Sequence, residues 1–142
     1  MRSGPLMRNL TPTYALAKMA ETKLQPVVLV AEDEALIRVW AAEVLEDNGF
    51  TVLEAANAEA AMRVLEARPE VRLLFTDIHM PGPFDGMELA RRVYDRWPHV
   101  QLVLTSGRIE PLVGEIPDDG RFLAKPYRAD ELVGQVQDLL RN

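Results

Sequence analysis

Polar side chains suited to binding metal and phosphate follow four apolar runs of this sequence, each at the point where the run ends. The runs are 28–31, 73–76, 102–104 and 122–124, and each reads as a buried strand. The polar residues are Glu32, Asp33, Asp77, Thr105, Ser106 and Lys125. Because the carboxyl ends of parallel strands lie along one edge of a sheet, we expect these side chains to meet in one shallow cluster.

Such a cluster would suit a divalent cation and a phosphoryl group. Three acids brought together repel one another unless one is protonated or a cation enters. The chain has no cysteine and only two histidines, so soft transition metals are poorly served. Carboxylate oxygens instead favour a hard cation, Mg²⁺ or Mn²⁺, combined with a phosphate. Lys125 beside the acids can pair with a carboxylate at rest and with a phosphoryl oxygen later.

Asp77 is not explained by helix capping. An aspartate after a strand is commonly a cap or a turn residue. Here a Pro- and Gly-rich loop over 80–86 follows, and the next predicted helix begins about ten residues after Asp77. We therefore expect Asp77 to act through its carboxylate. Glu34, by contrast, suits the first turn of a helix, where acids favour the helix dipole.

The composition limits the classes of function. The 142 residues carry a formal net charge of −6, which argues against broad contact with nucleic acid or with an anionic membrane. The absence of cysteine excludes disulfides and thiol catalysis and fits a reducing compartment. Apolar runs stay far below the ~20 residues of a membrane helix, and the N-terminus lacks a secretory pattern. We expect a cytoplasmic protein that binds neither nucleic acid nor membrane.

Strands and helices alternate from Gln25 onward. The predicted strands span about 26–31, 51–55, 71–76, 100–105 and 121–124. The predicted helices span about 35–48, 58–67, 87–97 and 129–141; Leu36 belongs to the apolar stripe of the first, and Asn57 is placed to cap the second. Segment 108–118 is ambiguous and permits one weak helix. Continuously apolar strands indicate that both sheet faces are covered, which predicts a doubly wound α/β sheet.

The beginning of the chain differs from the rest. We expect residues 1–25 to be an N-terminal extension, either flexible, partly left over from cloning, or forming a short helix over 11–24. Residues 26–142 are expected to form one domain. Whether the extension mediates a homodimer is left open by the sequence.

Together the motifs resemble those of the response regulator receiver family, whose simplest relative is the single-domain chemotaxis regulator. The resemblance covers about 26–141. It is carried by the acidic pair Glu32-Asp33, by Asp77 within Thr-Asp-Ile-His-Met-Pro-Gly, by Asp85-Gly86, by Thr105-Ser106-Gly107 and by Lys125-Pro126. Each motif alone is weak, but their order on the predicted strand ends is specific. The resemblance implies a stand-alone receiver with a flavodoxin-like (βα)5 fold and strand order 2-1-3-4-5.

The resemblance also implies phosphoryl transfer. Asp77 would accept a phosphoryl group from a phosphohistidine of a histidine kinase or a histidine phosphotransfer protein, and Lys125 would pair with that group. The implied Mg²⁺ (or Mn²⁺) ligands are Glu32, Asp33, Asp77 and the main-chain carbonyl of His79. The implied product is an aspartyl phosphate that later hydrolyses.

A conformational switch is implied as well. In the family a hydroxyl at the position of Thr105 swings toward the phosphoryl group, and an aromatic at the position of Phe122 turns into the space left. The change would alter the face formed by segment 108–118, the fifth strand and the last helix, and so the binding of an output protein. Pro111 and the Pro-Gly-rich run 116–120 make the helix before the fifth strand short or irregular.

Two other classes of function stay open. One is a receiver-like interaction module that is never phosphorylated, which retention of all the site residues argues against. The other is a phosphohydrolase with an Asp nucleophile, of the haloacid dehalogenase type. That type usually has an Asp-x-Asp motif after its first strand and a cap domain, whereas here His79 replaces the second acid. We therefore expect a signalling module rather than an enzyme.

Overall fold

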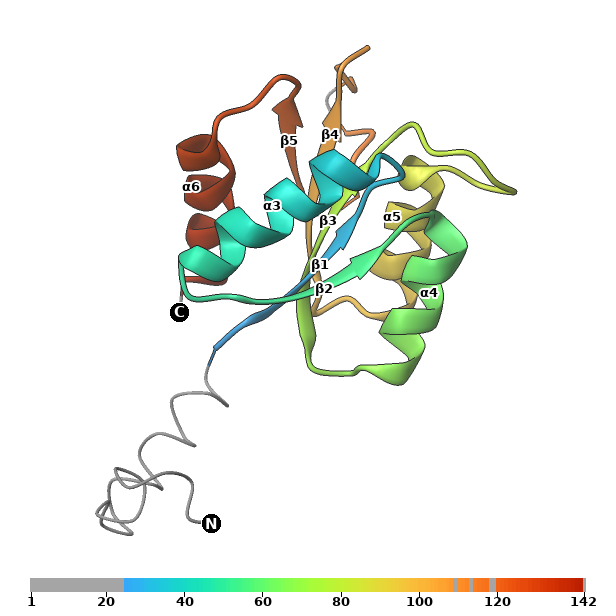
Figure 1. Cartoon of the computed structure of the whole chain (residues 1–142). Helices are drawn as coiled ribbons and strands as arrows, with labels where there is room; N and C mark the ends of the chain where they lie inside the picture. Colours follow the sequence, from blue (N-terminus) through green and yellow to red (C-terminus); the bar gives the residue numbers. More distant parts are fainter. Residues whose placement is uncertain (1–24, 109, 113, 118–119, 142) are drawn as a thin grey trace, which may run out of the picture.

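Five parallel strands form one sheet in the computed structural model, which describes residues 25–108, 110–112, 114–117 and 120–141. The strands are β1 (Val27–Ala31), β2 (Thr51–Ala55), β3 (Val71–Asp77), β4 (Gln101–Ser106) and β5 (Arg121–Ala124). Their order across the sheet is β2-β1-β3-β4-β5 (Figure 1). The predicted strand order and the flavodoxin-like parallel sheet are thus confirmed.

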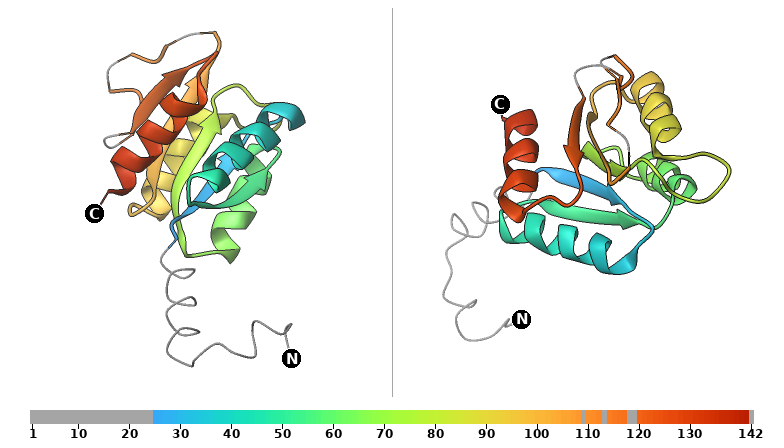
Figure 2. Two further views of the ribbon diagram at one scale, coloured as in Figure 1. Left: turned by 60° about the vertical axis from the view of Figure 1, so that its left-hand side comes forward. Right: turned by 90° about the horizontal axis from the view of Figure 1, so that it is seen from above.

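Helices cover both faces of this sheet. Within the described part of the chain they are α3 (Ala35–Asp47), α4 (Ala58–Ala67), α5 (Gly86–Arg96) and α6 (Ala129–Leu140). Helices α3 and α6 pack on one face, and α4 and α5 pack on the other (Figure 2). None of these helices is long and apolar enough to cross a membrane.

Each face of the sheet has its own apolar core. Leu29 and Leu74 pack with the residues of α4 and α5, whereas Val28 and Val30 pack with those of α3 and α6. All four are almost completely buried. Successive side chains of a strand point to opposite faces, so a strand covered on both sides is apolar throughout. Each such burial contributes roughly 1.5–3 kcal/mol, which fixes the strands that carry the polar side chains.

The helix boundaries follow local signals. The Asn57 side chain accepts a 2.8 Å hydrogen bond from the main-chain N–H of Ala60 and so caps α4, as predicted. Gly49, with φ of 92°, follows the end of α3. The expectation that Leu36 belongs to the buried stripe of α3 is wrong, because Leu36 is 87% exposed. It lies in the first turn of α3, whereas the buried residues begin at Ala41.

The connection from β4 to β5 contains no helix among its described residues. Pro111, Pro117 and two glycines interrupt the weak apolar pattern that permitted one. One of those glycines, Gly114, has φ of 90°, a conformation that a helix cannot contain. The described residues of this connection therefore do not form the helix that a complete (βα)5 pattern would have.

Of the predicted extension over 1–25, only Gln25 is described. Its side-chain oxygen accepts a 3.2 Å hydrogen bond from the Thr51 hydroxyl, and Thr51 N–H also donates to the carbonyl of Pro26. These contacts tie the start of β1 to the start of β2. Residues 1–24, and the short helix expected over 11–24, lie outside the described residues.

Candidate functional site

Strand register brings the predicted site residues to one edge of the sheet. Asp77 at the end of β3 lies opposite Thr105 of β4, and the N–H of Ile78 donates to the Thr105 carbonyl at 2.9 Å. Beyond the end of β5, the N–H of Lys125 donates to the carbonyl of Ser106 at 3.0 Å. The backbone ladder itself therefore places Lys125 beside Asp77, although the two residues are 48 positions apart.

The three acids form one cluster. Carboxylate oxygens of Glu32, Asp33 and Asp77 all lie within 4.8 Å of one another. Glu32 and Asp77 are buried, whereas Asp33 is exposed at the mouth of the cluster. Three hard oxygen donors at this separation, open to solvent on one side, fit an ion such as Mg²⁺ that retains some of its waters. The acidic cluster is thus consistent with the magnesium site that the resemblance implies.

The Lys125 ammonium is shared between two carboxylates. Its Nζ lies 3.0 Å from Glu32 Oε1 and 3.3 Å from Asp77 Oδ2, and only 18% of the side chain is exposed. Burial alone would lower the pKa of Lys125, but the hydrogen bond to Glu32 and the charge of Asp77 outweigh it and raise that pKa above 10.5. Lys125 is therefore a permanent cation between the acids.

The pKa of Glu32 is raised as well, but here burial is the main cause of the rise. Burial raises the pKa of Glu32 above its usual 4.5, and the Asp77 charge adds to this, despite hydrogen bonds from Glu34 N–H and Lys125. Two carboxylates and one ammonium leave excess negative charge, which favours the protonated form of Glu32 and the charged form of Lys125 at once. A divalent cation would remove that excess.

Main-chain donors fix the directions of the buried carboxylates. Glu32 Oε2 accepts a 3.1 Å hydrogen bond from the N–H of Glu34, and Asp77 Oδ1 accepts one of 3.3 Å from the N–H of His79. Each carboxylate thus uses one oxygen on the backbone and the other on Lys125. The predicted His79 carbonyl contact to a metal stays a prediction.

The Thr105 hydroxyl has no hydrogen-bond partner. The residue is 1% exposed, and its Oγ1 is the buried side-chain oxygen left unsatisfied among the residues that the structure describes. A buried hydroxyl without a partner is costly, so it normally finds one. Its neighbour Ser106 differs, because the Ser106 Oγ accepts a 3.0 Å hydrogen bond from the N–H of Arg108 and shapes the turn after β4.

Replacing Thr105 by Val is expected to keep or slightly raise the free energy of unfolding, by up to about 1 kcal/mol, because it removes an unsatisfied hydroxyl of nearly the same shape. The matched control is Thr76→Val: that hydroxyl donates to the Asp77 carbonyl at 2.9 Å, so its loss should cost about 1–2 kcal/mol. Urea unfolding of both variants measures the difference. Equal losses at the two positions would show that Thr105 has a partner in solution.

Phe122, the predicted switch aromatic, packs against the apolar core. Phe122 in β5 is partly buried and packs against the core cluster of α4 and α5, which includes Leu104, its register partner in β4. The predicted inward turn of Phe122 is not tested by this arrangement.

Two adjoining cavities open at the site. A polar one of about 350 Å³ is lined by Asp33, Glu34, Asp77, His79, Gly107, Arg108 and Lys125. An apolar one of about 440 Å³ shares Gly107 and Lys125 and is otherwise lined by Ile37, Trp40, Pro126 and Tyr127. The sequence analysis did not identify Arg108 and Tyr127 as residues of the site. Their positions shortly after the ends of β4 and β5 could have indicated that they lie at the same edge of the sheet.

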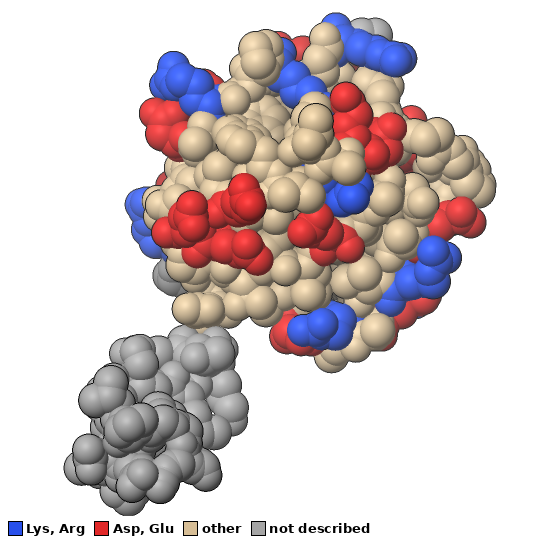
Figure 3. Space-filling model, in the orientation of Figure 1, with Lys and Arg blue, Asp and Glu red and all other residues tan. Residues whose placement is uncertain are grey.

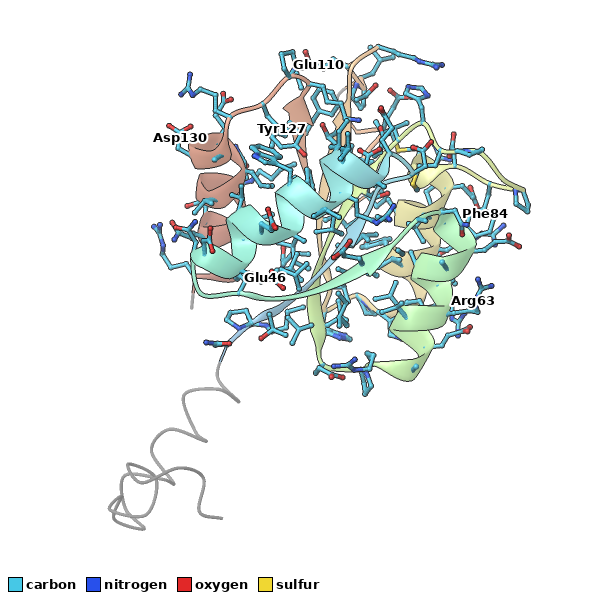
Figure 4. The ribbon with its side chains drawn as sticks, viewed as in Figure 1. Glu46, Arg63, Phe84, Glu110, Tyr127 and Asp130 are labelled. Atoms are coloured by element: carbon cyan, nitrogen blue, oxygen red, sulfur yellow. The ribbon has the colours of Figure 1, made fainter. Side chains whose placement is uncertain are left out.

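Tyr127 connects the apolar cavity to the core. Its ring contacts Trp40 of α3 and Phe75 of β3, each at 5.6 Å between ring centroids, and Figure 4 shows it between α3 and α6. Burial, together with the charges of Glu32 and Asp77, raises the pKa of the Tyr127 hydroxyl, which therefore stays neutral. Trp40 is 39% exposed and lines the cavity.

The loop after β3 is anchored to α5. The Phe84 ring lies beneath the guanidinium of Arg92, 3.8 Å from its centroid, and Figure 4 shows Phe84 at the outer edge of the molecule. The Asp85 carboxylate caps α5 by accepting a 2.9 Å hydrogen bond from the N–H of Glu88. The Lys125–Pro126 peptide bond, which follows β5, is cis.

Comparison with known proteins decides the family. Residues 28–137 match the response regulator receiver domain family. The chain belongs to that family. This receiver is 32% identical over 116 residues to the response regulator receiver protein CpdR of Brucella abortus, covering 80% of this chain and 95% of CpdR. It is also 32% identical over 117 residues to the sensor kinase CckA of the same organism, covering 80% of this chain but only 12% of the kinase.

A solved structure gives the same result. The response regulator receiver protein from Sinorhizobium medicae aligns with a TM-score of 0.76 at 27% identity, covering 82% of this chain and 95% of that one. This receiver therefore spans nearly the whole of some relatives and a small fraction of others. Receivers of this family are signalling modules in two-component systems rather than enzymes, and they interact with histidine kinases.

Proposed function

We propose that Asp77 is the phosphoacceptor of a two-component or phosphorelay pathway. In the proposed step an Asp77 oxygen attacks the phosphorus of a phosphohistidine on a histidine kinase or phosphotransfer protein. An acyl phosphate bond forms, the phosphorus–nitrogen bond breaks, and the donor histidine leaves with its electron pair. The observation that carries the proposal is the Asp77 carboxylate held between the acidic cluster and the Lys125 ammonium.

The surrounding residues have distinct proposed roles. Glu32, Asp33, Asp77 and the His79 carbonyl would hold Mg²⁺ (or Mn²⁺), which when bound offsets negative charge on the transferring group. Lys125, already a cation in contact with Asp77, would pair with a phosphoryl oxygen. Because phosphorylation adds nearly two negative charges, Lys125 gains a stronger partner than the resting carboxylate.

The donor is proposed to be a protein that docks on α3. Its phosphohistidine has to reach Asp77, so its surface must cover the neighbouring residues. In the first turn of α3, which follows the acidic residues, Leu36 is 87% exposed, and Trp40 lines the apolar cavity that shares Lys125 with the site. Exposed apolar side chains of this size beside a reactive centre favour a protein partner. Lys and Arg lie scattered among acidic and uncharged groups on the face in Figure 3.

The proposed output is a change of partner binding near β5 and α6. The unsatisfied Thr105 hydroxyl would gain a partner by turning toward the phosphoryl oxygens, and Phe122 would move toward the vacated space. This movement would alter the surface presented by the described residues of 108–118, and an output protein would bind there.

We also propose that the receiver spans residues 26–142 of a cytoplasmic protein and that residues 1–25 are an extension.

Mass spectrometry tests the function. The protein is incubated with acetyl phosphate, once with Mg²⁺ and once with a chelator in excess. We expect one added phosphoryl group, only with Mg²⁺, on the peptide that contains Asp77. No added group under either condition, or a group on another residue, would refute the proposal and leave an interaction module. Continuous release of phosphate without a stable adduct would instead indicate a phosphohydrolase.

Replacing His79 by Asn is expected to change the half-life of phosphorylated Asp77 several-fold. His79 lines the same polar cavity as Asp77, two residues after it, so its side chain would lie beside a water that attacks the phosphoryl group. The decay of the adduct is followed after the donor is removed. His99→Asn, an exposed histidine after α5, is the matched control and should leave the half-life unchanged. Equal half-lives in all three proteins would show that His79 has no part in hydrolysis.

A further inference from the structure

Arg38 makes two contacts that the proposed phosphoryl transfer does not use. From the first turns of α3, its Nη1 donates a 2.8 Å hydrogen bond to the main-chain carbonyl of Glu32. Its Nε lies 3.2 Å from Glu54 Oε1 on β2 and forms an ion pair there. Only 18% of the Arg38 side chain is exposed, whereas 41% of the Glu54 side chain is.

The Glu32 carbonyl belongs to the peptide unit that joins Glu32 to Asp33. In the preceding peptide unit, the N–H of Glu32 donates a 3.0 Å hydrogen bond to the carbonyl of Ala55 at the end of β2. The backbone of Glu32 is therefore held on its N–H side by β2 and on its carbonyl side by Arg38. Arg38 is itself braced against β2 through Glu54. Rotation of this peptide would move the Glu32 and Asp33 side chains together.

We propose that Arg38, braced by Glu54, is a positioning residue for the divalent cation. It acts by fixing the Glu32–Asp33 peptide so that both carboxylates converge with Asp77. The inference rests on the proposed function only in that the cation belongs to the same site. A side chain that orients metal ligands without touching the metal commonly contributes 10–100-fold to affinity. The expected contribution here is about 10-fold, because Glu34 N–H and Lys125 also hold Glu32.

Two effects of Arg38 oppose each other and have to be separated. Its positive charge repels a cation, so deleting it would by itself strengthen binding, whereas loss of the carbonyl contact would weaken it. Arg38→Lys keeps the charge but cannot reach the carbonyl and Glu54 with a fixed planar fork. This variant therefore isolates positioning from charge. Glu54→Gln removes the brace and leaves Arg38 in place.

Binding of Mn²⁺ alone, measured by electron paramagnetic resonance of the free ion, tests the proposal without phosphoryl transfer. We expect Arg38→Lys to raise the Kd for Mn²⁺ about 10-fold and Glu54→Gln to raise it about 3-fold. The matched control is Arg63→Lys on α4, an exposed arginine whose Kd should equal that of wild type (Figure 4). Unchanged Kd values in both test variants would overturn the proposal.

A merely structural role for Arg38 predicts a different pattern. Urea unfolding without metal would then show lower stability, while the folded fraction of each variant would keep the wild-type Kd. If Arg38→Lys does not fold, Glu54→Gln alone decides. If wild type binds Mn²⁺ and the Kd rises as expected, but acetyl phosphate adds nothing to Asp77, the proposed function fails and the positioning role stands. If phosphorylation proceeds and the Kd is unchanged, only the positioning role fails.

Discussion

Replacing Asp77 by Asn is expected to reduce phosphoryl uptake from acetyl phosphate to background. The amide has no nucleophilic oxygen of comparable strength. Within the acidic cluster, Asp77 is the residue that both ends a strand and contacts Lys125. Stability should change by no more than about 1 kcal/mol. Asn can still accept from His79 N–H, and Lys125 keeps Glu32 as a partner. Intact-protein mass spectrometry and urea unfolding measure the two quantities.

The Asp77 variant carries a second expectation. Because the Asp77 charge helps to raise the pKa of Glu32, its removal should lower that pKa toward 4.5. The matched control is Asp95→Asn, an exposed position in the last turn of α5, which should take up a phosphoryl group as wild type does. Undiminished uptake by the Asp77 variant would mean that another carboxylate accepts the group.

Replacing Gly86 by Ala is expected to have the second largest effect. A methyl group at Gly86 would overlap the main-chain carbonyl of Asp77 and would lie 2.9 Å from the Cα of Ile78. These are backbone atoms of the strand end that carries Asp77, so relief requires the strand end or α5 to move. We expect a loss of about 3 kcal/mol in the free energy of unfolding.

The same displacement should slow phosphorylation. A shift of the Asp77 backbone by a fraction of an ångström misaligns its carboxylate with Lys125, and misplacement on this scale costs about 10- to 100-fold in rate. Gly134→Ala in α6 is the control, because nothing lies within 4 Å of a methyl group there. That change should stabilise the protein by about 0.5–1 kcal/mol. A Gly86 variant that matched wild type in stability and rate would show that the close approach does not exist.

The sequence was sufficient to predict the sheet and the clustering of the acids with Lys125. Both follow from backbone rules: apolar strands covered on two faces are continuously apolar, and parallel strands end at a common edge. Asp77 and Lys125 had to meet once β3, β4 and β5 were neighbours. Strand order itself needed the resemblance, because periodicity says which residues are buried but not which strands pair.

Side-chain contacts were less predictable. Leu36 carries the helical spacing of a core residue, yet it lies in the first turn of α3 and is exposed, because periodicity does not say where a helix passes the edge of its sheet. Arg38 reaches both Glu32 and Glu54, a contact that depends on how α3 lies against β2. The connection from β4 to β5 was ambiguous because its apolar residues favoured a helix and its prolines and glycines opposed one.

The ion pair between Glu32 and Lys125 joins residues 93 positions apart in the chain. Between them come four of the five strands of the sheet and three of its four described helices, so no short fragment can assemble the pair. Contacts of such long range form late and only when the intervening topology is complete. The proposed reactivity of Asp77 therefore requires that the fold between Glu32 and Lys125 be complete. A truncated or partly unfolded molecule would then not be phosphorylated, and so it would not produce a signal.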